Sequence, residues 1–218
     1  LSFMAAIVII HTSFRIHDDL PFMDNEELRR GKPTTWKVYG YDMAVLAGDA
    51  LMIFAFETAA KALALGGDPE RVARAMGILA ERTGIYGMIG GQRMDLQNEG
   101  KEVGIEVIEQ TNRLKTGALI IAAAQLGCIA AGADNKMTEL AKKYAEQIGL
   151  AIQITDDILD CTSSAEVLGK PFGSDAENHK TTYVSVYGLE KAMSIAAEEI
   201  QKAKDALNQM GMQERSPF

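Results

Sequence analysis

The chain has 218 residues, of which 22 are lysine or arginine and 30 are aspartate or glutamate, so its formal net charge is −8. This length is enough for one sizeable domain. The net negative charge argues against a general nucleic-acid binder, which needs a basic face, and against a polybasic membrane-surface protein. The apolar fraction of 47% excludes intrinsic disorder.

The pattern along the chain predicts helices, because there is no Asn-Gly hairpin signal and no sustained period-two alternation. Pro21 ends the first helix, and Gly66-Gly67 ends the second. The expected helices cover residues 1–17, 34–65, 69–88, 103–131, 136–162 and 189–210, with a loop at 169–173. Several of them are apolar nearly all round, which is typical of the middle of a large bundle. We therefore expect one all-α domain over residues 1–218.

Cysteine content and apolar runs bear on location. Cys128 and Cys161 are too few for a disulfide framework and favour a reducing compartment. We expect a cytoplasmic protein, with a plastid or another organelle left open because the chain does not begin with methionine. The run at 118–133 contains Gln125 and is shorter than the ~20 residues that a bilayer requires. No transmembrane segment is expected.

Two clusters of aspartate lie at the ends of apolar helical stretches. They are Asp18, Asp19 and Asp24, and then Asp156, Asp157 and Asp160. Spacings of three and four put the second cluster on nearly one helix face, whereas in the first Pro21 makes Asp24 return by a loop. Crowded carboxylates repel one another unless something positive neutralises them. Oxygen ligands without histidine or cysteine suit Mg²⁺, which is commonly shared with substrate phosphates.

Basic residues accompany both clusters. Arg29 and Arg30 follow the first, Lys115 lies within an apolar helix, and Lys170 and Lys180 follow the second. A polyphosphate needs a metal that bridges it to the acids, and Arg or Lys for its remaining oxygens. Taken singly, these residues also fit solvated acidic helix ends, surface ion pairs and a snorkelling lysine. Together they predict a helical, metal-dependent diphosphate site.

These residues resemble the trans-isoprenyl diphosphate synthases of the farnesyl and geranylgeranyl diphosphate synthase type. The matching blocks, in chain order, are residues 16–34, 46–51, 90–92 with Asp95, 115–119, 152–160 and 168–183. The resemblance implies an all-α isoprenoid-synthase-type helical bundle around a central cavity, usually in a homodimer. It also implies three Mg²⁺ ions that bridge the aspartates of both clusters to the diphosphate of an allylic substrate.

The resemblance further assigns roles residue by residue. Arg29, Lys115 and Lys170 would hold the allylic diphosphate, with Lys180 also among the substrate-binding residues. Arg30 would hold the diphosphate of isopentenyl diphosphate, and Thr116 and Gln153 would face the developing allylic cation. The catalytic residues expected on this basis are Asp18, Asp19, Lys115, Thr116, Gln153 and Asp156.

The implied reaction is a condensation of isopentenyl diphosphate with a dimethylallyl, geranyl or farnesyl diphosphate. Ionisation of the allylic C–O bond requires a stabilised leaving group, which metal and lysine supply. The isopentenyl double bond then attacks the cation, and a proton is lost to the departing diphosphate. No dedicated side-chain base is needed, and an apolar pocket protects the cation from water.

The sequence departs from the family in three respects. A Gly-Gly-Lys-Arg type block upstream of the first cluster is absent, as is a basic C-terminal tail, so we expect a synthase domain without its N-terminal helices and C-terminal tail. Ser13 and Phe14, five and four residues before Asp18, would set chain length: Ser13 makes room and Phe14 removes it. We expect a product of fifteen or twenty carbons, with ten if Phe14 points inward. Arg15 is unexpected on such a wall, and we expect it to face a dimer partner or solvent.

Two other functions remain open. A class I terpene cyclase shares the first aspartate motif but usually carries an Asn/Ser/Glu metal motif second, whereas the second cluster here is all aspartate. A non-catalytic regulatory subunit of a heteromeric prenyl synthase would resemble the family but tends to lose its aspartates. Catalysis by the protein alone would separate the latter from a synthase.

Overall fold

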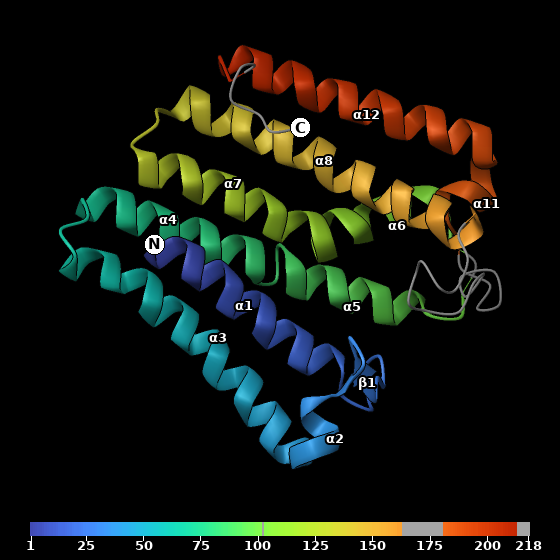
Figure 1. The fold of residues 1–218 in the computed structure, drawn as a ribbon, viewed down its shortest axis with the longest axis horizontal. Coiled ribbons are helices and arrows are strands. Elements are labelled where there is room, and N and C mark those ends of the chain that lie inside the picture. The colour runs from blue at the N-terminus through green and yellow to red at the C-terminus, as the bar shows by residue number, and fades with distance from the viewer. Residues whose placement is uncertain (102, 163–180, 213–218) are drawn as a thin grey trace. The chain divides into compact units, whose positions relative to one another are not determined.

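The computed structural model describes residues 1–101, 103–162 and 181–212, and helices form almost all of their regular structure (Figure 1). The expected all-α class is therefore confirmed. The chain divides into two compact units, residues 1–80 with 129–132 and residues 81–128 with 133–218, which are described separately. That they form the single domain expected from the sequence stays a prediction.

The first unit is built on two long helices that pack side by side, α1 and α3 (Figure 1). Its elements are α1 (Ser2–Asp18), β1 (Leu28–Arg29), β2 (Lys32–Pro33), α2 (Thr35–Tyr39), α3 (Tyr41–Ala64) and α4 (Pro69–Thr83). The last residues of α4 belong to the second unit. The helix expected at 34–65 is interrupted at Gly40, whose φ of 89° is open to glycine but strained for other residues. The interruption separates α2 from α3.

A small antiparallel hairpin between α1 and α2 was not predicted. Its strands pair Leu28 with Pro33 and Arg29 with Lys32. The two turn residues, Arg30 and Gly31, both have positive φ, 52° and 73°, as a tight two-residue hairpin turn requires. The Arg-Gly pair was therefore the local signal for this hairpin. The hairpin matters because it positions Arg29 and Arg30.

Within the described residues, all regular structure of the second unit is helical. Its helices are α5 (Met88–Asn98), α6 (Ile105–Asn112), the π-helix η1 (Arg113–Gly117), α7 (Ala118–Ala131), α8 (Asn135–Thr162), α11 (Tyr183–Tyr187) and α12 (Leu189–Gln209), with α7 ending in the first unit. Helices α8 and α12 lie side by side (Figure 1). Ile154, Tyr183, Ala192 and Ala196 form a buried core between α8, α11 and α12.

Several expected boundaries were wrong. Gly90 and Gly91, which follow the helix expected at 69–88, lie inside α5. The sequence predicted neither α5 nor α11. The expected helix at 103–131 contains η1, where the backbone follows a π-helix. The expected loop at 169–173 lies outside the described residues.

Two helical stretches are long and apolar enough to cross a bilayer by length and composition alone. These are Tyr41–Ala64 and Ile105–Ala130. Core helices of soluble proteins pass the same test, so the two stretches are weak evidence and do not show a membrane span.

Candidate functional site

The first aspartate cluster surrounds the C-terminus of α1. The helix ends at Asp18, and Asp19 is its C-cap. Pro21 disfavours helical geometry in the residue before it, and the chain turns back so that the N–H of Asp24 donates to the carbonyl of Asp18 at 2.8 Å. The expected return of Asp24 by a loop is thus confirmed. The turn brings the backbones of Asp18 and Asp24 together, with Asp24 exposed and Asp19 only 5% exposed.

Asp19 is paired with Arg29 of the hairpin. Arg29 Nε and Nη2 lie 2.7 and 2.5 Å from Asp19 Oδ1. This hydrogen bond is the main reason that the pKa of Arg29 is raised, with the charges of Asp19, Glu26 and Asp18 adding to it while partial burial opposes it. The pairing joins a predicted metal ligand to a predicted diphosphate ligand. Arg30 follows at the exposed turn.

Behind the cluster, His17 fixes the end of α1 against α3. Its Nε2 lies 3.1 Å from the carbonyl of Val45 and 3.5 Å from Asp49 Oδ1. The ring lies directly over Gly48, where a Cβ atom would overlap its Nε2 and Cδ2. This contact accounts for Gly48 in the 46–51 block, which the sequence identified without a role. A glycine at 48 allows the histidine beside Asp18 to pack flat on α3.

The two proposed chain-length residues are both buried in α1. Ser13 is 0% exposed, and its hydroxyl donates to the carbonyl of Ile10 at 2.9 Å. It is one turn before His17 and therefore on the face of α1 that packs on α3. Phe14, at 9% exposure, is one turn before Asp18. Their effect on product length stays a prediction.

The second aspartate cluster lies in the last turns of α8, where its members differ in environment. Asp156 is exposed, and Asp160 is 1% exposed. Asp157 Oδ2 accepts a hydrogen bond of 2.8 Å from the N–H of Tyr183, at the start of α11. The sequence treated all three as ligands or their close neighbours. The structure gives Asp157 an anchoring contact that the spacing could not indicate.

Tyr183 ties α11 to α6 as well as to α8. Its hydroxyl donates to Glu109 Oε1 at 2.9 Å, and its side chain is 1% exposed. Burial first, and then the hydrogen bond to Glu109, raise the pKa of Tyr183 well above its usual value. The end of α8 is thus held in place through one buried tyrosine.

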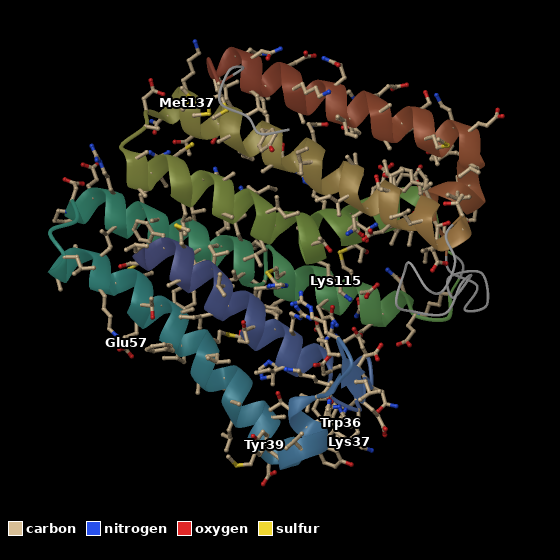
Figure 2. All side chains as sticks on the ribbon, in the orientation of Figure 1. Trp36, Lys37, Tyr39, Glu57, Lys115 and Met137 are labelled. Atoms are coloured by element: carbon tan, nitrogen blue, oxygen red, sulfur yellow. The ribbon has the colours of Figure 1, made fainter. Side chains whose placement is uncertain are left out.

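Lys115 lies on η1 (Figure 2). It forms an ion pair with Asp95 of α5. The distance from Lys115 Nζ to Asp95 Oδ2 is 2.6 Å. Helix α5 approaches η1 so closely that a Cβ at Gly91 would lie 2.6 Å from the Cα of Lys115. π-helical segments are rare and frequent at functional sites. Here the segment contains Lys115 and Thr116, two of the predicted catalytic residues.

Gln92 and Asp95 were recognised in the sequence only as family residues without a role. Gln92 is 7% exposed, and neither atom of its amide has a hydrogen-bond partner among the described residues. A buried amide without a partner is costly and is typical of a site that receives a ligand. In the sequence, the pattern that could have pointed to these two residues is the Gly90-Gly91-Gln92 block followed by Asp95.

A cavity of about 710 Å³ opens within the second unit, between α6, η1, α7 and α8. Gln153 lines it, whereas Lys115, Thr116 and Asp156 do not. Arg113 and Glu146 also line it, 3.4 Å apart. The predicted cation-facing residues Gln153 and Thr116 are therefore not brought together in this cavity.

The donor set fits Mg²⁺. Both clusters offer carboxylate oxygens, the hard ligands that Mg²⁺ prefers. Across residues 1–101, 103–162 and 181–212, no three acidic, histidine or cysteine side chains form a ready metal site. Lys170 and Lys180, the two other predicted substrate ligands, lie outside the described residues.

Comparison with known families and proteins gives a consistent result. The sequence model of the polyprenyl synthetase family matches residues 1–214. A heterodimeric geranylgeranyl pyrophosphate synthase large subunit 1, chloroplastic, from Arabidopsis thaliana is 47% identical over 206 residues, 93% of this chain and 56% of that protein. A chloroplastic geranylgeranyl pyrophosphate synthase from Capsicum annuum is 45% identical over 214 residues, 98% of this chain and 58% of that protein.

Solved structures agree in fold. An FPP/GFPP synthase from Zymomonas mobilis superposes with a TM-score of 0.82 at 37% identity, covering 95% of this chain and 69% of that one. A geranyltransferase from Helicobacter pylori, complexed with magnesium and isoprenyl diphosphate, gives 0.83 at 32% identity, covering 99% and 69%. The expected isoprenoid-synthase fold is confirmed.

Two points follow from the curated relatives. The chain spans just over half the length of those it matches. The expectation of a cytoplasmic protein was wrong, because these relatives are chloroplastic. The presence of only two cysteines, Cys128 and Cys161, favours a reducing compartment but does not distinguish one such compartment from another.

Proposed function

The chain belongs to the polyprenyl synthetase family, and we propose that it is a prenyltransferase that condenses an allylic diphosphate with isopentenyl diphosphate. The observation that carries the proposal is the pairing of acids with cations at predicted site positions. Asp19 with Arg29 and Lys115 with Asp95 each join a carboxylate to a diphosphate-binding type of side chain. The chloroplastic names of the relatives support a plastid location.

Binding and ionisation are proposed to use the cations and acids predicted from the sequence. Arg29 and Lys115 bind the allylic diphosphate, together with Lys170 and Lys180, while Arg30 binds the diphosphate of isopentenyl diphosphate. Asp18, Asp19, Asp156 and their neighbours would hold Mg²⁺, which would supply positive charge to the leaving diphosphate. We propose three ions, by analogy with the family. Asp24, Asp157 and Asp160 support these ligands.

Carbon–carbon bond formation needs correctly oriented substrates and the exclusion of water more than it needs an added base. Thr116 and Gln153 present oxygen atoms to the developing allylic cation. Apolar helix faces exclude water that would otherwise hydrolyse it. The allylic C–O bond breaks and the diphosphate departs with the electron pair, and the isopentenyl double bond then attacks the allylic cation. The departed diphosphate takes a proton from the resulting carbocation, which forms the new double bond of the product.

A twenty-carbon product is favoured. The curated relatives are named geranylgeranyl pyrophosphate synthases, and Ser13 keeps the position five residues before Asp18 small. Farnesyl diphosphate is the alternative, because Phe14 adds bulk one residue later. The Zymomonas mobilis protein, named an FPP/GFPP synthase, supports keeping that alternative.

A homodimer is proposed through α3. Met43, Leu46, Ile53 and Phe54 lie on one side of this helix and are 53, 60, 70 and 43% exposed. Such a row of exposed apolar side chains is typical of an interface. One relative is named a heterodimeric large subunit, so a different family member as partner is the second candidate. Light scattering of the purified protein, alone and with such a partner, separates the two.

Product analysis tests the proposed function. The full-length protein is incubated with Mg²⁺, isopentenyl diphosphate and dimethylallyl, geranyl or farnesyl diphosphate, and the prenyl alcohols are sized after dephosphorylation. Geranylgeraniol is the expected product. A cyclic hydrocarbon would favour a terpene cyclase. No product from folded protein would favour a regulatory subunit.

A further inference from the structure

A row of side chains on α1 faces the hairpin of the first unit. His11, Arg15 and Asp19 follow one another at intervals of four, so they share one face of the helix. Arg29 is bonded to Asp19 through two nitrogen atoms, which brings the hairpin to this face. Arg30 is the next residue, at the turn. Cations from α1 and from the hairpin therefore converge beside Asp19.

The charges of this group are not balanced. The pKa of Arg15 is lowered by burial and then by the charges of Arg29 and Arg30, with only Asp19 acting in the opposite sense. The pKa of His11 is lowered by burial and then by the charges of Arg15, Arg30 and Arg29. Asp19, the carboxylate that acts on Arg15, is already bonded to Arg29. In the described part of the chain, neither Arg15 nor Arg30 makes an ion pair or side-chain hydrogen bond.

An arginine at position 15 is costly unless an anion compensates it. It is partly buried, on a helix that otherwise carries mostly apolar side chains. Taking a guanidinium partly out of water and setting it beside two others is unfavourable on both counts. The protein as a whole carries a charge of −8, so this local excess of positive charge is not a general feature of its surface.

We propose that Arg15 is a diphosphate-binding residue, which together with Arg30 takes oxygen atoms of a substrate diphosphate. The proposal rests on the proposed function and adds a residue to its site. A diphosphate offers several negative charges and acceptor oxygens, and the planar guanidinium fork matches two of them at once. Arg15 and Arg30 would add two guanidinium groups to that of Arg29, which is bonded to Asp19. The position expected to face a partner or solvent then has a specific use.

Calorimetry on the full-length protein tests this proposal. Inorganic pyrophosphate and isopentenyl diphosphate are titrated into the wild type and into Arg15→Leu, Arg15→Gln and Arg15→Lys. Loss of one charge-assisted contact should weaken binding about tenfold in the first two and about threefold in the third. The salt dependence of the affinity should also become shallower in Arg15→Leu, which a merely structural role would not cause.

Arg74→Leu is the matched control. It removes the same charge from an exposed position of α4 in the same unit, and its affinities should equal those of the wild type. Steady-state KM values assign the diphosphate: a rise for isopentenyl diphosphate alone, or for the allylic substrate alone, identifies which one Arg15 binds.

Two outcomes overturn the proposal. One is an Arg15→Leu protein that binds both probes as tightly as Arg74→Leu does. The other is unchanged affinity together with loss of the dimer, which would assign Arg15 to an acid of a second copy. A wild type that binds neither probe and forms no prenyl product would instead refute the proposed function itself.

Discussion

Replacing Gly48 with alanine should loosen the end of α1 that carries the first aspartate cluster. The added Cβ would overlap Nε2 and Cδ2 of His17 and lie 2.8 Å from its Cε1. The ring must move, and its hydrogen bond to the carbonyl of Val45 is then lost. Such crowding costs about 1–3 kcal/mol, and the lost hydrogen bond about 1 kcal/mol more.

Helix propensity opposes this cost. Alanine is favoured over glycine by about 1 kcal/mol within a helix, so the net loss should be about 1–3 kcal/mol. Gly77→Ala is the control, because it adds a methyl group to α4 where nothing lies within 4 Å. That variant should be stabilised by up to about 1 kcal/mol.

Urea unfolding at one fixed protein concentration measures both variants, and Mg²⁺ titration of turnover reports on Asp18. In a His17→Ala background the ring is gone, so Gly48→Ala should no longer destabilise. The reasoning is refuted if Gly48→Ala is as stable as Gly77→Ala, or if it destabilises equally with and without the ring.

Three further predictions concern the second unit. Lys115→Met should lower kcat/KM at least about a hundredfold in steady-state assays, because it removes a cation from the diphosphate site; an effect under fivefold would contradict its role. Asp157→Ala should lower the free energy of unfolding in urea by about 1 kcal/mol, because the contact with the N–H of Tyr183 is lost. It should leave the Mg²⁺ requirement of turnover in place. Asp156→Ala, by contrast, should abolish Mg²⁺-dependent turnover. The pKa of Tyr183 is raised above its value of 10.0 in the unfolded chain, so its contribution to stability is complete below pH 10 and is lost as pH rises further. Tyr183→Phe should therefore reduce the fall in unfolding free energy at alkaline pH. An unchanged slope of unfolding free energy against pH would count against this.

Much of the fold could be read from the sequence because its helices are long and apolar. The bounds expected for α1, α8 and α12 differ from those observed by no more than one residue at either end. What failed depended on local backbone geometry. The positive φ values of Arg30, Gly31 and Gly40 create a hairpin and a helix break, and hydrophobic periodicity does not report on them.

The candidate site was predictable in its residue types and less so in its contacts. Proline and spacing were enough to foresee how Asp24 returns toward Asp18. The partners of Asp157 and Lys115 could not be foreseen, because Tyr183 and Asp95 are distant in sequence and meet them only through tertiary packing. Gly48 and Gly91 are in the same category, since each is needed for a close approach of another helix or side chain.

The most direct test of the central proposal is a crystal structure of the full-length protein with Mg²⁺ and a non-reactive thiolodiphosphate analogue of the allylic substrate. We predict one diphosphate bridged by Mg²⁺ to Asp18 or Asp19 and to Asp156, with Arg29 and Lys115 on its remaining oxygen atoms. A diphosphate held by one aspartate cluster alone, or bound away from both, would contradict it.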